Sequence, residues 1–414
     1  MLISSRENLA TRKRSVWPRT ILTAMTVVEA HWESKAAAHR AFLASRVPNG
    51  WRVPVLDSPK VGALNIHNGI WSSEVVTTAF CERAAVAKQW LNWALHGLPI
   101  SVKKIFDVPG TPSTFGFISC IEGIAPRDGL IVALRKEAGT IPFIKTNISQ
   151  RCLLVESSNN IFGTVLNPWN PSLSAGGSPG CNCEGVLVAF RGSPLGVGTD
   201  GRGPLRTPAA WNGVCTIKPS SAGIPGGARG NWYSDSTTGY YGPFANGVIN
   251  MRIWMQAVLG THPWLKDPGI LPMPWNTTIQ ALKKLNIGLL LDDGIIDSSP
   301  PLRNAGHEVL ELGWATLHRR ATEIIFRIYT QEGGVGIREQ LEKSAEPLIP
   351  RTFTARKGVR NDYMKAWQEL WPDTMITAPY PHPAPPHGQY ITSAIPAMYN
   401  LLDYPCCIIP PYTG

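Results

Sequence analysis

The sequence predicts an α/β fold with a largely covered sheet. Stretches of strong helix formers alternate along the chain with short apolar runs, a pattern typical of strands that helices cover on both faces of a sheet. Turn-forming residues are abundant, with 39 glycines and 36 prolines, and they separate these segments. The length of 414 residues fits one large domain of this class.

The first elements in chain order are two helices and a strand. Residues 32–45 contain strong helix formers with apolar residues at helical spacing, and residues 73–95 repeat that spacing. Residues 97–103 predict a turn followed by a short buried strand. We therefore expect residues 1–72 to form a helical and extended N-terminal region and residues 73–414 to form the main domain.

Helices and strands then alternate in the middle of the chain. Residues 129–135 and 185–190 predict helices. Each is followed by a short apolar run, at 141–145 and 195–198, that predicts a buried strand. This alternation is the main evidence for the α/β class.

The rest of the chain is predicted to combine loops, helices and two further strands. Residues 204–220 and 223–241 are rich in glycine and proline, so we expect loops with short strands there. The other predicted elements are, in chain order, a helix at 248–260, a buried strand at 287–291, helices at 308–320 and 321–332, and a short strand at 375–377.

Composition and charge argue against several classes of protein. Apolar residues make up 43% and charged residues 16% of the chain, as in globular proteins. The net charge is +10, but the basic residues are scattered, so we expect no nucleic-acid partner. Residues 21–28 are apolar but too few to span a bilayer. Eight cysteines without a regular framework or a secretory signal indicate a reducing compartment. We expect a cytoplasmic protein, with a homodimer as an open alternative.

Residues 174–219 are the most informative segment, because glycine and serine cluster there where the backbone must approach another group closely. The segment contains Gly176-Gly177-Ser178 and, further on, Gly198-Thr199-Asp200. These motifs resemble the core of the amidase signature family, and residues 190–196 and 257–260 narrow the resemblance to its fungal acetamidase-like branch. The resemblance implies an amidase-signature fold, in which a mixed central sheet is flanked by helices.

The resemblance also implies a reaction. The family hydrolyses a carboxylic amide to an acid and ammonia or an amine with a nucleophilic serine, a bridging serine and a lysine base, and it needs no metal or organic cofactor. Lys103 matches the lysine and Ser178 the bridging serine; burial favours the neutral form that a lysine base requires. Lys104 follows where the family has an acidic residue. Its ammonium either lowers the pKa of Lys103 by repulsion or points to solvent. We expect a small-molecule amide as the ligand.

The nucleophile position departs from the family pattern. In the run Gly-Thr-Asp-Gly-Arg-Gly-Pro, Pro204 stands where the family has its serine, and Arg202 replaces a glycine. Proline has neither a hydroxyl group nor a backbone N–H, so it removes the nucleophile and one donor of the oxyanion hole. The expected substrate-binding and oxyanion-binding residues are Thr199, Asp200, Gly201, Arg202 and Gly203.

These departures leave three interpretations open. The protein is an amidase homologue with impaired turnover, a non-catalytic relic that binds amide-like ligands, or a decayed product that scarcely folds. Ser178 and Cys181 are the candidate surrogate nucleophiles under the first interpretation. The family continues into a final helical portion beyond the point where this chain stops, which predicts a domain shortened at its C-terminus.

Two further pairs of residues have alternative interpretations. Cys181 and Cys183 form either a metal-binding or nucleophilic pair or two ordinary thiols, and the lack of a nearby partner motif favours ordinary thiols. His382 and His387 are either ligands or loop histidines; we expect loop histidines, because the family site that the chain resembles uses no metal.

Overall fold

The computed structural model describes residues 32–41, 95, 97–152, 156–177, 181–226, 239–276, 286–290, 308–314, 316–321, 335–346, 366–370, 372–377, 383–389 and 394–410. Residues 32–41 are helical, in agreement with the first predicted helix. The predicted helix at 73–95 lies outside the described residues apart from its last position, and so does nearly all of the predicted helix at 321–332.

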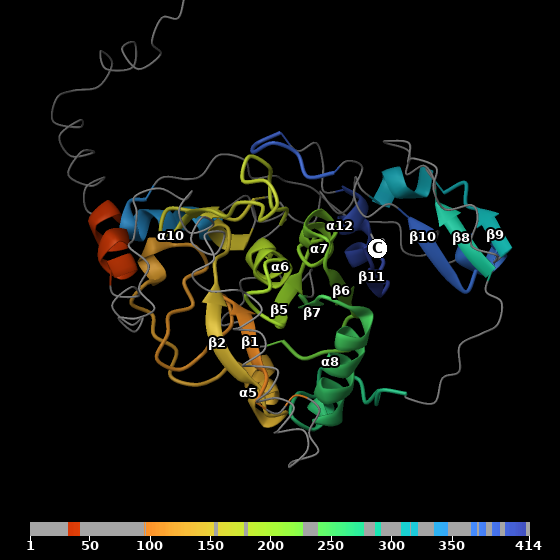
Figure 1. The fold of residues 1–414 in the computed structure, drawn as a ribbon, viewed down its shortest axis with the longest axis horizontal. Helices are drawn as coiled ribbons and strands as arrows, with labels where there is room; N and C mark the ends of the chain where they lie inside the picture. The colour runs from red at the N-terminus through yellow and green to blue at the C-terminus, as the bar shows by residue number, and fades with distance from the viewer. Residues whose placement is uncertain are drawn as a thin grey trace, which may run out of the picture.

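A six-stranded mixed sheet forms the centre of the molecule (Figure 1). Its strands lie in the order β11-β6-β7-β5-β1-β2. In chain order they are β1 (Pro99–Lys103), β2 (Ile141–Thr146), β5 (Leu195–Asp200), β6 (Cys215–Lys218), β7 (Tyr240–Ala245) and β11 (Cys406–Ile408). Strand β1 pairs in parallel with β2 and β5, whereas the other pairs are antiparallel. The expected mixed central sheet is confirmed.

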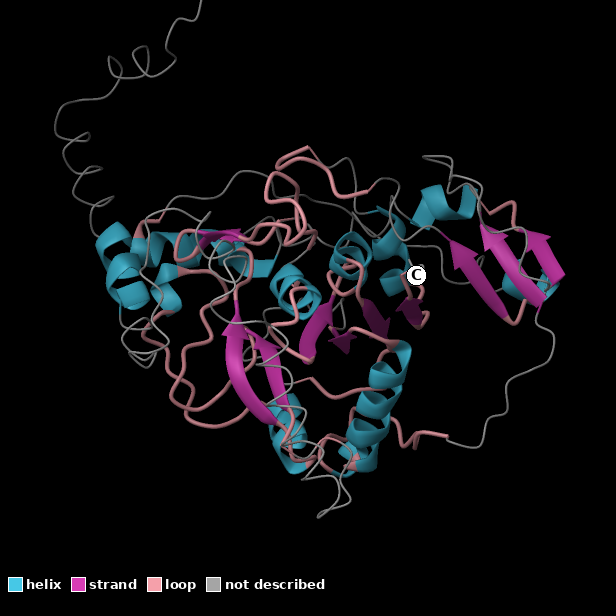
Figure 2. Cartoon of the chain, viewed as in Figure 1, coloured by secondary structure: helices cyan, strands magenta, loops and turns pink. Residues whose placement is uncertain are grey.

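Helices cover both faces of this sheet (Figure 2). They are α5 (Leu130–Glu137), α6 (Asn182–Ala189), α7 (Arg206–Asn212) and α8 (Val248–Gly260). Because side chains alternate between the two faces of a strand, Val102 and Val197 join a core that includes Trp254 of α8. On the opposite face, Gly196 leaves space for Glu184 of α6. The α/β class predicted from the alternating pattern is therefore confirmed.

A second, three-stranded parallel sheet lies near the C-terminal end of the chain. Its order is β10-β8-β9, with β8 at Asn286–Leu290, β9 at Glu308–Glu311 and β10 at Thr374–Thr377. Leu290 and Trp314 pack in one cluster with Met398 of helix α12 (Ala394–Leu401). Further elements are η2 (Ile118–Cys120), η3 (Gln150–Cys152), β3 (Ser158–Asn159), β4 (Gly163–Thr164), η4 (Pro263–Leu265) and α10 (Val335–Ser344), and residues 316–321 and 366–370 are also helical.

Two expectations about secondary structure are wrong. Residues 308–311 form β9 instead of starting a helix, because Val309 pairs with Ile287 of β8 and this pairing overrides the local helical pattern. The end of that predicted helix is confirmed, since residues 316–320 are helical. A helix, α7, lies within the segment 204–220 that we expected to be a loop with short strands. It ends at Gly213, whose φ of 70° is the left-handed conformation that terminates many helices.

The predicted burial of the strand at 141–145 is also wrong. Strand β2 is the edge of the central sheet, and Ile141, Phe143 and Ile144 are 55%, 44% and 42% exposed among the described residues. An apolar run therefore indicated the strand correctly but not its position in the sheet.

The proposed division at residues 72 and 73 stays a prediction, because residues 42–94 lie outside the described part of the chain. Within the part that the structure describes, none of the helices combines the length and the apolar character needed to cross a membrane.

Candidate active site

Adjacent parallel strands bring Lys103 to Thr199. Strands β1 and β5 pair in register, with Val102 opposite Val197, so their carboxyl ends meet at one edge of the sheet. The Lys103 side chain is fully buried, and its Nζ donates a hydrogen bond to Thr199 Oγ1 at 2.5 Å. Two residues that the sequence predicted separately, 96 positions apart, therefore lie in direct contact.

Buried thiols lie around Lys103. Burial raises the pKa of Cys152 and of Cys181, and the Lys103 ammonium acts in the opposite direction on both. Cys181 Sγ donates to the Thr199 carbonyl at 3.0 Å, and it accepts the Thr199 N–H at 3.0 Å. Burial outweighs the Lys103 ammonium and the hydrogen bonds to Thr199, which lower the pKa of Cys181, so the thiol stays protonated and is a poor nucleophile.

Glu184 is a buried carboxyl group that the sequence analysis did not single out. It accepts hydrogen bonds from Ser101 Oγ of β1 and, at 2.6 Å, from Thr146 Oγ1 of β2. Burial raises its pKa to about 7, against the opposing effects of these hydrogen bonds and of Lys103. A Cβ atom at Gly196 would lie 2.4 Å from Glu184 Oε2, so the carboxyl group requires glycine there. The only sequence signal was an acidic residue inside an otherwise apolar helix.

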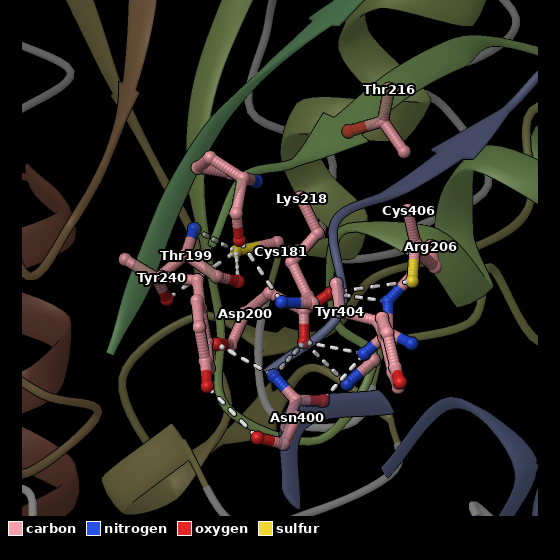
Figure 3. Close-up of polar contacts among 12 residues, drawn as sticks. Cys181, Thr199, Asp200, Arg206, Thr216, Lys218, Tyr240, Asn400, Tyr404 and Cys406 are labelled. Atoms are coloured by element: carbon pink, nitrogen blue, oxygen red, sulfur yellow. Dashed lines mark hydrogen bonds and ion pairs between the residues drawn. The ribbon is translucent and has the colours of Figure 1, made fainter. Parts of the chain in front are cut away.

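The carboxylate of Asp200 organises the loop after β5 (Figure 3). It accepts the Gly203 N–H at 2.7 Å, Arg206 Nε and Nη2 at 2.9 Å each, and Asn400 Nδ2 at 3.0 Å. Burial by itself would raise the pKa of Asp200. The Arg206 guanidinium, with smaller contributions from Lys218 and the Gly203 N–H, outweighs burial and holds this pKa below its usual value. Charge-assisted bonds of this kind are strong in a buried setting.

The loop turns sharply at Gly203 and delivers Pro204 to the start of α7. Gly203 has a φ of 103°, a conformation that side chains other than hydrogen rarely allow. Gly201, Arg202 and Pro204 are buried in the same turn. The Gly203 N–H, one expected oxyanion donor, is already bonded to Asp200. The structure thus brings Lys103 into contact with Thr199, at the start of the segment 199–204, while Ser178 lies outside the described residues.

Lys104 does not point to solvent, so that alternative is wrong. Only 5% of the residue is exposed, and its Nζ lies 4.5 Å from the ring centroid of Phe162, a cation–π contact. Burial lowers its pKa to about 8. A second lysine that the sequence analysis did not single out lies nearby: Lys145 Nζ donates to Pro112 O at 3.0 Å and to Ser113 Oγ at 3.1 Å.

The alternative ligand residues are engaged in ordinary contacts. His387 Nδ1 lies 2.8 Å from Glu156 Oε1, and Nε2 lies 3.1 Å from Pro171 O, so this histidine anchors its loop. Burial raises the pKa of Cys183 well above the usual value. Within the described residues, no group of three or more His, Cys, Asp or Glu side chains is placed to hold a metal ion. His382 lies outside those residues.

Comparisons with known proteins show which family the chain belongs to. The sequence model of the family described as Amidase matches residues 65–334. The acetamidase of Emericella nidulans is 29% identical over 478 aligned positions, covering 92% of this chain and 86% of the relative. The acetamidase of Aspergillus oryzae is 29% identical over 485 positions, covering 92% and 87%. Both alignments exceed the 414 residues of this chain, so these relatives contain segments that have no counterpart here.

Among solved structures, a fatty acid amide hydrolase is similar in fold, with a TM-score of 0.77 and 24% identity over 92% of this chain and 84% of that chain. The chain belongs to the amidase family. It lies in the fungal acetamidase-like branch, as the motifs predicted.

Proposed function

We propose that this protein is an amidase-family hydrolase homologue for carboxylic amide C–N bonds whose own turnover is impaired at Pro204. The observation that carries the proposal is the contact of Lys103 Nζ with Thr199 Oγ1, 2.5 Å, beside a loop that ends in proline. This contact supports the proposal, because a lysine base and the loop with the nucleophile position have to lie close together. The hydroxyl group that would attack the amide is absent from that loop.

The proposed mechanism explains why one substitution has a large effect. A serine at position 204 would form a bond to the carbonyl carbon while its proton passed through Ser178 to neutral Lys103. That proton would be returned to the leaving nitrogen as the C–N bond broke, and water would then hydrolyse the acyl ester to the acid and free the serine. Proline supplies neither the oxygen nor the proton. Loss of a nucleophile in serine hydrolases lowers the rate by roughly three to six orders of magnitude, and we expect a loss in this range.

Cys181 is a poor replacement for the missing nucleophile. Its Sγ is bonded to both the N–H and the carbonyl of Thr199, and its pKa is raised by burial. These contacts favour a structural role at the start of α6. Ser178 stays the other candidate surrogate.

A non-catalytic amide-binding protein is the second candidate function. It is favoured by the Asp200 network, in which the carboxylate, Gly203 and Arg206 keep the loop ordered although the nucleophile is absent. A small-molecule amide is the proposed ligand in both cases. A cytoplasmic location is part of the proposal, supported by the free cysteines among the described residues. The homodimer stays a prediction that size-exclusion chromatography with light scattering tests.

The first prediction is that Pro204→Ser restores amide hydrolysis. We would compare purified wild type and Pro204→Ser on a panel of small aliphatic and aromatic amides, with a thermal melt of each as the folding control. Pro208→Ser is the matched control, because it exchanges a buried proline in α7, four residues further along, without supplying a nucleophile at the site. We expect turnover only with Pro204→Ser, and its loss when Lys103→Met is added.

Two outcomes distinguish the alternatives. Saturable binding of an amide by a folded Pro204→Ser variant without turnover supports the non-catalytic protein. Wild-type hydrolysis at an ordinary enzymatic rate contradicts the assignment of Pro204 to the nucleophile position.

A further inference from the structure

The side-chain amide of Asn400 in helix α12 contacts Asp200 at the end of β5 (Figure 3). Asn400 Nδ2 donates to the Asp200 carbonyl at 3.2 Å and to Asp200 Oδ1 at 3.0 Å. Asn400 Oδ1 accepts a hydrogen bond from Arg206 Nη2, and the Asn400 carbonyl accepts the Tyr240 hydroxyl at 2.8 Å. Only 6% of Asn400 is exposed. Asn400 therefore connects helix α12 to Asp200, which lies 200 positions earlier in the sequence.

The oxygen that Asn400 binds is the one that holds the turn. Asp200 Oδ1 also accepts the Gly203 N–H at 2.7 Å. A rotation of the Asp200 carboxylate would move this acceptor and release the turn that carries Gly201, Arg202 and Gly203. Asn400 bonds both the carbonyl and the carboxylate of Asp200, so it opposes that rotation.

We propose that Asn400 is a positioning residue that acts through Asp200 to fix the backbone turn at residues 201–203, where the carbonyl oxygen of an amide ligand would bind. The positioning of the turn follows from the contacts alone, whereas its use for an amide rests on the proposed function. Helix α12 then contributes to the candidate site by holding the turn at residues 201–203 in place.

The side-chain chemistry explains why an amide serves here. A carboxamide donates through its nitrogen and accepts through its oxygen, and Asn400 faces a carboxylate on one side and a guanidinium on the other. An aspartate at this position would have no donor for Asp200 and would add a second negative charge beside it. Alanine would remove the donor and the acceptor without adding a charge.

The same part of the chain supplies a matched control. Three residues after Asn400, the Asp403 carboxylate accepts the Ser221 N–H at 2.6 Å and the Ser221 hydroxyl. It attaches the C-terminal segment to the loop after β6, not to the loop after β5. Asp403→Asn therefore weakens a neighbouring attachment and leaves the Asp200 contacts in place.

The test is amide hydrogen exchange of the full-length protein measured by mass spectrometry. We expect Asn400→Ala and Asn400→Asp to increase exchange in the segment 198–206 by about tenfold or more, with little change in 97–104. Asp403→Asn should leave 198–206 unchanged. Equal exchange of 198–206 in all variants, or an equal increase with Asp403→Asn, overturns the proposal. If neither Asn400 variant unfolds cooperatively, the residue is a general folding requirement and the positioning role is rejected.

Kinetics in the Pro204→Ser background separate this proposal from the proposed function. If that variant hydrolyses amides, adding Asn400→Ala should lower kcat by about a hundredfold, as misplaced site groups do, and leave KM nearly unchanged. A change in KM alone contradicts positioning of the turn. If Pro204→Ser shows neither turnover nor amide binding, the proposed function fails, whereas the exchange experiment still decides the role of Asn400.

Discussion

At the residue scale, a buried lysine, Lys104, and a half-buried lysine, Lys145, make stability depend on pH. Burial and, to a smaller extent, the Lys104 ammonium lower the pKa of Lys145 to about 7, against an opposing effect of Asp107. In the unfolded chain its pKa returns to about 10.4. Below pH 7 Lys145 is charged in both the folded and the unfolded chain, and the charge destabilises the folded state by the full free energy of its desolvation. Between about pH 7 and pH 10 the unfolded chain binds more protons, so this lysine makes stability rise with pH.

We predict that Lys104→Met raises the free energy of unfolding at pH 7 and flattens its increase with pH. The substitution removes a buried charge and the repulsion that it exerts on Lys145. It keeps the apolar contact with Phe162, because the methionine chain follows the stem of lysine. Urea unfolding of both proteins at several pH values from about 6.5 to 9.5 measures the difference.

A surface lysine provides the control for this experiment. Lys136 is 40% exposed in its side chain and pairs with Asp128 at 2.7 Å, and exposed pairs contribute little. In Lys136→Met, the free energy of unfolding should therefore increase with pH as steeply as in the wild type. If Lys104→Met leaves the increase of the free energy of unfolding with pH unchanged, Lys104 contributes to it neither by its own titration nor through Lys145.

At the scale of elements, the contact between α5 and α8 contains a buried cation. Arg135 is 1% exposed, and its guanidinium lies 4.0 Å from the ring centroid of Trp254. Among the described residues, none of its three guanidinium nitrogens has a hydrogen-bond partner. A cation–π contact contributes up to about 2 kcal/mol, whereas burying a charge without a paired anion costs several kcal/mol.

We therefore predict that Arg135→Met raises the free energy of unfolding by about 1–4 kcal/mol. Methionine keeps the apolar contact with Trp254 and removes the buried charge. Arg252→Met on the exposed side of α8 is the control. Its free energy of unfolding should lie within about 0.5 kcal/mol of that of the wild type. A loss of stability in Arg135→Met would mean that the cation–π contact outweighs burial.

The elements also show how far the sequence predicts this structure. Strands β1 and β5 and helices α5, α6 and α8 follow from local patterns, because short apolar runs and helical spacing are local properties. Strand β9 does not, because its identity depends on pairing with β8. Lys103 and residues 199–204 came from motif resemblance. Glu184 and Asn400 were not predicted, because the motifs that carry the resemblance do not include them and local patterns do not show contacts with partners 83 and 200 residues away.

At the scale of the whole molecule, helix α12 contacts both sheets, one by apolar packing and the other by hydrogen bonds. Met398 is fully buried and packs with Leu290 of β8 and Trp314, while Asn400, two residues later, bonds Asp200 at the end of β5. The smaller sheet and the central sheet are therefore attached to one helix. Such shared packing predicts that the two sheets unfold together.

We predict that Met398→Ala lowers the free energy of unfolding by about 2–5 kcal/mol, the range for large-to-small core substitutions. Hydrogen exchange in increasing urea, followed for residues 97–104 and 286–290, should show both midpoints moving down together. Met273→Ala, at a position that is 48% exposed, is the control and should move neither. If only the urea midpoint of residues 286–290 moves, the smaller sheet unfolds separately from the central sheet. Helix α12 then keeps the hydrogen bond between Asn400 and Asp200 when the smaller sheet is unfolded. The candidate site would then depend on the helix alone and not on the sheet packed behind it.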